Sequence, residues 1–326
     1  MGRKVRSTTL PVFTFLIFVR KVTIVGAGKV GVTAAYALLL SGEVGEIMLF
    51  GRSRSKLVGE KLDLEHARAL ASETTISISD DYADLKDTDI FVFCAGAAQV
   101  PGETRLQLAA KNLHIVDQMV PSLLAAAPEA VLLMVANPVD LLTYRACELL
   151  QLPAGRVFGS GTLLDTARFR FHLSEFMQVN PRSIHAYVLG EHGDHSFPVI
   201  SAATIGGTPL VSFPGFSQEA ARDAYARARD AAYAIIDSKG ATYYGIGASI
   251  SKIVRTIFAN GKTILPLNVP IDNYYDEGKI SLSVPCILGR QGVLQPLQPA
   301  LDASEQAALH TGAAALRQVY QDTVTS

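Results

Sequence analysis

Residues 21–31, KVTIVGAGKVG, constrain the fold of this chain more than any other stretch. A short apolar run typical of a buried strand passes directly into Gly26, Gly28 and Gly31, which open a segment with helical periodicity. In such a strand–turn–helix, the first glycine permits a tight turn, and the second lets main-chain N–H groups reach a pyrophosphate. The third lets helix and strand pack closely, with the helix N-terminus facing the phosphates. The stretch therefore predicts a dinucleotide-binding unit.

Apolar runs and helical segments alternate from residue 21 to about residue 161. Strands are expected at KVTIVG, EIMLF, TTISIS, DIFVFCAG and AVLLMVANP, with helices over 29–41, 55–71 and 105–127. Apolar strands separated by helices indicate a parallel sheet covered on both faces. After RVFGSG the pattern is mixed, with helices over 162–178, 218–239, 246–259 and 304–321 and strands at SIHAYVLG, TILPLNV and KISLSVPCILG. The expected fold class is α/β: a Rossmann-type doubly wound parallel sheet in a dinucleotide-binding domain (20–161), followed by an α+β catalytic domain (162–326).

The composition favours a small-molecule partner. The 326 residues carry a net charge of -1 at pH 7 and are 49% hydrophobic, as in globular proteins. Without an excess of positive charge, we expect no binding of nucleic acid or of an anionic membrane surface. Cys94, Cys147 and Cys286 are far apart and lack CxxC spacing, which favours free thiols in a reducing cytoplasm.

Residues 1–19 form an N-terminal extension of uncertain role, with a basic front and an apolar run over 11–19. The run is too short to span a bilayer. An export signal is disfavoured because Arg20 and Lys21 follow in place of small residues suited to cleavage. The alternatives are an arm that packs on a neighbouring subunit, or an upstream start that the folded protein does not need.

The end of the second expected strand, IMLFGRSRSK, lacks the acidic residue that usually binds the adenosine ribose of NAD. Gly51 stands there, followed by Arg52 and Arg54, with Ser53 between them. Glycine removes the repulsion of a 2′-phosphate, and arginine supplies forked donors suited to phosphate. We therefore expect NADP(H) to be accepted or preferred; the alternative is a solvated loop with adequate NAD(H) binding.

Four further segments carry chemistry: AGAAQVPGETRLQL (95–108), ANPVD (136–140), GSGTLLDTARFR (159–170) and VLGEHGDHSFP (188–198). In their order and spacing, the chain resembles the lactate/malate dehydrogenase family from about residue 20 to its C-terminus. The resemblance implies reversible hydride transfer between a nicotinamide dinucleotide, NAD(H) in this family, and a 2-oxo or 2-hydroxy acid. It also implies a homo-oligomer, with a tetramer expected.

The resemblance assigns roles to six residues. His192 is the proton donor to the substrate carbonyl, and Asp165 holds its other ring nitrogen. Arg168 binds the substrate carboxylate, and Arg105, in a mobile lid, stabilises charge on the carbonyl oxygen. Asn137 and Thr242 line the substrate pocket. Without the family, an Asp/Arg pair three residues apart is more often a surface ion pair.

A metal site is not expected. His192, Asp194 and His195 lack the usual ligand spacings of a metal site. His195 does not match the family motif, and we interpret it as a core or surface histidine.

Gln99 indicates the substrate. The family's oxaloacetate reductases usually carry arginine at this position, whereas glutamine favours pyruvate, because an unpaired substrate carboxylate in a closed site is costly. Val100 leaves room for a larger apolar 2-oxo acid. We therefore expect an L-lactate dehydrogenase. The alternatives are a malate dehydrogenase, because GRSRS resembles a loop of NADP-dependent chloroplast malate dehydrogenases, and a dinucleotide-binding redox sensor without catalysis.

The resemblance also implies two further sets of residues. Arg170 and His185 match positions at which some bacterial lactate dehydrogenases bind fructose 1,6-bisphosphate; the alternative is local structural bonding. The cofactor is expected to contact the glycine loop, the turn after the second strand and several further residues: Gly26, Gly28, Val30, Gly31, Gly51, Arg52, Ser53, Arg54, Lys56, Tyr82, Gly96, Ala97, Val135, Asn137 and Ser160.

Overall fold

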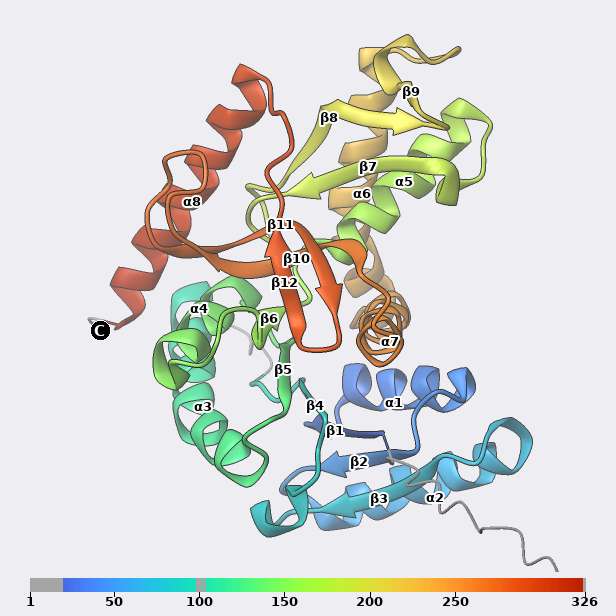
Figure 1. Ribbon diagram of the computed structural model, residues 1–326, viewed down its shortest axis with the longest axis vertical. Coiled ribbons are helices and arrows are strands. Elements are labelled where there is room, and N and C mark those ends of the chain that lie inside the picture. Colours follow the sequence, from blue (N-terminus) through green and yellow to red (C-terminus); the bar gives the residue numbers. More distant parts are fainter. Residues whose placement is uncertain (1–19, 98–101, 103, 325–326) are drawn as a thin grey trace, which may run out of the picture.

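The computed structural model of the chain describes residues 20–97, 102 and 104–324 (Figure 1). They form a nine-stranded sheet, a three-stranded sheet and the helices that cover them. The expectations for residues 1–19, Gln99 and Val100 lie outside the described residues. Among the described residues, no helix is both long enough and apolar enough to span a bilayer.

Six parallel strands form the N-terminal part of the large sheet. They are β1 (Lys21–Val25), β2 (Glu46–Phe50), β3 (Thr75–Ser79), β4 (Ile90–Phe93), β5 (Val131–Met134) and β6 (Val157–Gly159). Their spatial order is β6-β5-β4-β1-β2-β3, so the chain winds outward from β1 in one direction and from β4 in the other. This is the order of a doubly wound dinucleotide-binding sheet. The expected fold class is confirmed.

Helices cover both faces of this sheet (Figure 1). On one face, α1 (Lys29–Ser41) and α2 (Arg54–Ala71) pack against strand side chains that include Val22 and Ile24. On the other face, α3 (Arg105–Ala126) and α4 (Val139–Leu150) pack against Phe91 and Phe93, and a short 3₁₀ turn, η1 (Tyr82–Leu85), follows β3. Because both faces of the central strands are buried, β4 and β5 are apolar throughout, whereas the edge strand β3 alternates Ile with Thr and Ser.

The second half of the chain extends the same sheet. Its elements are α5 (Leu163–Met177), η2 (Pro181–Ser183), β7 (Ile184–Leu189), β8 (Phe197–Ile205), β9 (Thr208–Pro209), η3 (Leu210–Ser212), α6 (Gln218–Lys239), α7 (Tyr244–Phe258), β10 (Thr263–Ile271), β11 (Ile280–Gly289), β12 (Gly292–Pro296) and α8 (Ala303–Val324). β10 pairs antiparallel with β6 through Asn268 and Gly159, and β11 and β12 continue beyond it. β7, β8 and β9 form the separate sheet, which packs against α5 and α6.

Four strands of the structure, β6, β8, β9 and β12, have no counterpart in the expectations from the sequence. β8 exposes Ser201 and Ala202 in its middle, and β12 ends in Gln295 and Pro296, which are weak strand formers. Pairing with β7 and β11 therefore supplies what local propensity lacks.

Candidate active site

The glycine loop after β1 is shaped for close packing on one side and for a ligand on the other. Gly26 has φ of 100°, and a Cβ added there would lie 2.8 Å from the main-chain nitrogen of Ala95. A Cβ on Gly31 would lie 2.1 Å from the carbonyl oxygen of Gly26, so α1 begins tightly against the loop. At Gly28, by contrast, an added Cβ would meet nothing within 4 Å. The loop thus fits the pyrophosphate of a dinucleotide, which needs open space above main-chain N–H groups.

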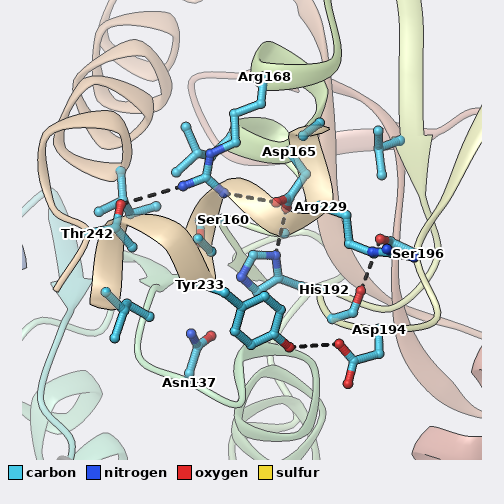
Figure 2. A pocket seen from close by; sticks show the side chains of 18 of the residues that line it. Asn137, Ser160, Asp165, Arg168, His192, Asp194, Ser196, Arg229, Tyr233 and Thr242 are labelled. Carbon is cyan, nitrogen blue, oxygen red and sulfur yellow. Dashed lines mark hydrogen bonds and ion pairs between the residues drawn. The ribbon is translucent and has the colours of Figure 1, made fainter. Parts of the chain in front are cut away.

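A cavity of about 230 Å³ lies between the carboxyl ends of the central strands and helices α5, α6 and α7. Four expected cofactor residues from the first half of the chain line it: Val30, Val135, Asn137 and Ser160. The second half contributes Asp165, Arg168, His192 and Thr242, which are all the expected catalytic and substrate-binding residues of that half (Figure 2). Residues as far apart in the sequence as Val30 and Thr242 therefore line the same cavity.

Asp165 is at the centre of the polar contacts in this cavity. One carboxylate oxygen lies 2.8 Å from Nδ1 of His192, and the other lies 3.4 Å from a terminal nitrogen of Arg168 (Figure 2). The second terminal nitrogen of Arg168 donates to Oγ1 of Thr242 at 3.5 Å. Asp165 and Arg168 lie one helical turn apart in α5 and are only 17% and 13% exposed, so they are not a solvated surface pair.

The electrostatic environment favours the protonated form of His192. Burial opposes the charge on the imidazole, but the charge and hydrogen bond of Asp165, together with the charge of Asp140, outweigh burial and raise the pKa of His192 to about 9. Burial likewise opposes the charge on Asp165, yet the interactions with His192 and Arg168 hold the pKa of its carboxyl below the usual value. Because Nδ1 faces Asp165, His192 is placed to give a proton to the cavity from Nε2.

Two buried polar residues support the cavity, and sequence reasoning missed their roles. The amide nitrogen of Asn112 donates to the carbonyl oxygen of Asn137 at 2.7 Å, and its amide oxygen accepts from the main-chain nitrogen of Ala97 at 2.7 Å. Asp140 accepts a hydrogen bond from the main-chain nitrogen of His192. For Asn112, the signal available in the sequence was a polar side chain on an otherwise apolar helical face.

The residues after β2 lie on the surface at the start of α2. Arg52, Ser53, Arg54 and Lys56 are exposed, and the main-chain nitrogen of Gly51 donates to Ser79 at 3.1 Å. Arg54 forms an ion pair of 3.1 Å with Asp80, which follows the neighbouring strand β3. An acidic residue is thus present beside this loop after all, although it comes from another strand.

The other expected cofactor residues lie at the same edge of the sheet. Gly96 and Ala97 follow β4. The ring of Tyr82 packs at a tilt of 60° against that of Phe50, with 5.1 Å between ring centroids, and lines a separate hollow rather than the His192 cavity. Tyr82 therefore lies beside Phe50, the residue before Gly51, and apart from the His192 cavity.

Arg105 is the first residue of α3. Thr104 caps this helix in a reciprocal arrangement, in which its hydroxyl accepts from the main-chain nitrogen of Gln107 and its own nitrogen donates to the Gln107 side chain. The position of the Arg105 side chain lies outside the description.

The two expected allosteric residues lie on and beside β7. Arg170 donates to the carbonyl oxygen of Ala186 at 2.8 Å, and its guanidinium lies over the ring of Tyr187, 5.3 Å from the centroid. His185 is exposed, two residues before Tyr187 on the same face of the strand. Arg170 therefore has local structural bonds, but it is also near an exposed histidine.

The side chains of the disfavoured metal site point to different partners. Nδ1 of His195 lies 2.5 Å from a carboxylate oxygen of Glu191, and Asp194 accepts from the Tyr233 hydroxyl at 2.8 Å. His192 faces Asp165. The three residues therefore do not converge on a common point.

Comparisons with known proteins agree with this geometry. Residues 20–159 match the family model of the lactate/malate dehydrogenase NAD binding domain, and residues 162–325 match that of the alpha/beta C-terminal domain. The chain is 42% identical over 303 residues to an L-lactate dehydrogenase of Geobacillus thermodenitrificans, covering 92% of this chain and 96% of the relative. It is also 42% identical over 300 residues to one from a Synechococcus strain, covering 92% and 98%.

Two solved structures have the same fold as this chain. A lactate dehydrogenase from a Medee basin deep-sea metagenome library superposes with a TM-score of 0.90 at 38% identity, covering 94% of this chain and 99% of that one. A minor L-lactate dehydrogenase from Enterococcus mundtii has a TM-score of 0.90 at 36% identity, covering 93% and 98%. Because the two family models together span both halves of the chain, and both halves contribute side chains to the His192 cavity, this chain belongs to the lactate/malate dehydrogenase family.

Proposed function

We propose that the chain is an L-lactate dehydrogenase that interconverts pyruvate and lactate with a nicotinamide dinucleotide. The observation that carries the proposal is the His192–Asp165 contact of 2.8 Å beside Arg168, inside a cavity at the carboxyl ends of the central strands. Ligands of open α/β sheets bind at this edge. The names of the relatives and of the similar structures support the same activity.

The side chains in the cavity suit each part of a 2-oxo acid. The nicotinamide cofactor, when bound, supplies or accepts the hydride. Arg168 would bind the substrate carboxylate with its forked nitrogens, and His192 would donate its Nε2 proton to the carbonyl oxygen. Asp165 would stabilise the imidazolium and fix the orientation of the ring. Arg105 would stabilise charge on the carbonyl oxygen, and Asn137 and Thr242 would line the pocket.

One set of assays tests this proposal against its alternatives. We expect the full chain to oxidise NADH or NADPH with pyruvate much faster than with oxaloacetate, because Gln99 offers no cation to a second carboxylate. A preference for oxaloacetate would instead establish a malate dehydrogenase. Turnover with neither acid, despite cofactor binding, would favour the redox sensor.

We further propose that NADP(H) is accepted beside NAD(H), the cofactor implied by the family's NAD binding domain. Gly51 leaves no acid at the end of β2, and Arg52 is exposed there without an ion pair in the described part of the chain. Arg54 pairs with Asp80 but remains 67% exposed, so a phosphate could attract it away.

The arginines can be tested by substitution. The R52A/R54A variant is expected to lower kcat/KM for NADPH about tenfold, with little change for NADH, because one or two exposed charge-assisted contacts to the 2′-phosphate are lost. R68A, at the other end of the same helix, is the matched control. Equal effects of R52A/R54A on both cofactors would exclude phosphate recognition.

Regulation by fructose 1,6-bisphosphate is proposed from Arg170 and the exposed His185 near it. A guanidinium and an imidazole at these positions could hold a phosphate together with their counterparts in a second subunit. We expect the sugar bisphosphate to lower KM for pyruvate at neutral pH in the parent, and to have no effect on H185A. An unchanged KM in the parent would exclude this regulation.

We propose the following organisation for the whole protein. The dinucleotide-binding domain comprises residues 20–161 and the catalytic domain residues 162–326.

The whole protein is proposed to be a homotetramer in a reducing cytoplasm. A homotetramer would cover apolar side chains that α1 and α2 leave exposed, including Tyr36, Leu40 and Leu62. The three cysteines are all free thiols, which supports a reducing cytoplasm. Light scattering of the purified chain would give the number of subunits.

A further inference from the structure

Two lysines from opposite halves of the chain lie around one tyrosine at the rim of the His192 cavity. Lys29 is the first residue of α1, directly after the glycine loop, and Lys239 is the last residue of α6. Nζ of Lys239 lies 3.6 Å from the centroid of the Tyr243 ring. Nζ of Lys29 lies 6.0 Å from the same centroid. The fold therefore gathers two positive charges that are far apart in the sequence.

This cluster adjoins the candidate site in both halves of the chain. Val30 and Thr242, the immediate neighbours of Lys29 and Tyr243 in the chain, line the cavity. On the other side of Lys29, a Cβ added to Gly28 would meet nothing within 4 Å, so the space beside the loop is open. The two ammonium groups thus lie next to the place at which the pyrophosphate of a dinucleotide is expected.

Aromatic rings hold the charge of Lys239 in position. Its Nζ lies 4.1 Å from the centroid of Tyr244 as well as over Tyr243, and the two ring centroids are 4.6 Å apart. The negative faces of such rings attract an ammonium group. Lys239 and Tyr244 are nevertheless exposed. The charge is therefore fixed in place but remains accessible to a ligand.

No carboxylate balances these two charges. Neither lysine forms an ion pair with an acidic residue in the ranges 20–97 and 104–324. Asp237 precedes Lys239 by two residues in α6, a spacing at which helical side chains do not face each other. On α2, by contrast, Lys61 pairs with Glu65 at 3.4 Å. Like charges gathered without a counter-charge repel each other, so this arrangement favours the binding of an anion.

We propose that Lys29 and Lys239 bind the pyrophosphate of the cofactor, and that Tyr243 is the positioning residue that holds the two cations beside the glycine loop. The inference rests on the proposed function, because a dinucleotide is the ligand that places its anionic part at such a loop. It adds side-chain charges to the main-chain N–H groups of the loop. Because Lys239 belongs to the second half of the chain, the pyrophosphate would be held from both halves.

Cofactor affinity, measured by NADH fluorescence, tests the proposal without turnover. K29Q/K239Q is expected to bind NADH about tenfold more weakly than the parent, because charge-assisted contacts to the phosphates are lost. ADP, which keeps the pyrophosphate, should lose affinity by the same factor in calorimetry, whereas adenosine should bind parent and variant equally. Unchanged affinity for NADH and ADP would overturn the proposal. If only KM for pyruvate rose, the anion would be the substrate carboxylate, and the proposal would also be wrong.

Substitutions at Tyr243 test its role as the positioning residue. Y243A is expected to weaken the binding of NADH and ADP, whereas Y243F keeps the ring and should bind both as the parent does. Equal affinities of Y243A and the parent would mean that the ring does not position the lysines.

A matched control separates a specific contact from a general effect of charge. K86Q/K279Q removes the same net charge from two exposed lysines, before β4 and before β11, that do not line the cavity. This variant should bind NADH and ADP as the parent does, and an equal loss in both double variants would exclude a specific contact. If the parent turned over neither acid but the lysines still governed ADP binding, only the proposed function would be refuted.

Discussion

Replacing His192 with asparagine is expected to lower kcat for pyruvate reduction about a thousandfold, while the chain folds and binds cofactor as before. A positioned acid contributes roughly 10²–10⁴ in rate, and asparagine can still accept or donate a hydrogen bond but carries no transferable proton. The loss corresponds to about 4 kcal/mol of transition-state stabilisation. Steady-state kinetics with pyruvate, together with cofactor binding by fluorescence, measure both parts of this expectation.

The pH profile of the parent provides the complementary measurement. With the pKa of His192 raised to about 9, pyruvate reduction should persist through neutral pH and decline as pH rises through that value. Lactate oxidation needs the neutral ring and should rise over the same range.

H195A is the matched control for H192N, since His195 contacts Glu191 rather than Asp165. Rapid pyruvate turnover by H192N would remove the basis of the proposed mechanism.

Replacing Arg168 with lysine is expected to lower kcat/KM for pyruvate about a hundredfold, mainly through KM. Lysine keeps the charge but loses the planar fork that can bind both oxygens of a carboxylate. Two charge-assisted hydrogen bonds to the substrate are thereby replaced by one, at a cost of a few kcal/mol. A contact made to both the substrate and the transition state appears chiefly in KM. Kinetics over a wide range of pyruvate concentrations would separate the two parameters.

R229K is the appropriate comparison for R168K. Arg229 also lines the cavity, but it is exposed and its guanidinium pairs with the adjacent Asp230 at 2.8 Å. We expect little change in KM from this variant. If R168K and R229K were equally impaired, the carboxylate would not be bound specifically by Arg168.

Much of the fold could be predicted because its signals are local. The apolar runs of β1 to β5 and the glycines after β1 identify the doubly wound sheet, and the helix expected over 29–41 has those bounds in the structure. The missing strands pair with neighbours close in the sequence, so what hid them was their weak or short local pattern. β12, for example, follows β11 after only two residues, but it is short and ends in Gln295 and Pro296.

The candidate site shows a similar division. Short motifs were sufficient to select Asp165, Arg168 and His192, which lie around one cavity. The role of Asp140 could not be predicted, because it depends on a main-chain N–H group 52 residues further along the chain. The partner of Arg54 was also missed, since Asp80 comes close only through the pairing of β2 with β3.

The pairing of Gly159 with Asn268 has a consequence for protein engineering. In a chimera that exchanged residues 20–161 with those of a relative, to alter cofactor choice, the exchanged part would meet the host part within one sheet, at the pairing of β6 with β10. The grafted β6 would have to match the host's β10 in register and in side-chain volume. Exchanging only the turn after β2 would leave the pairing of β6 with β10 unchanged, and is therefore the safer design.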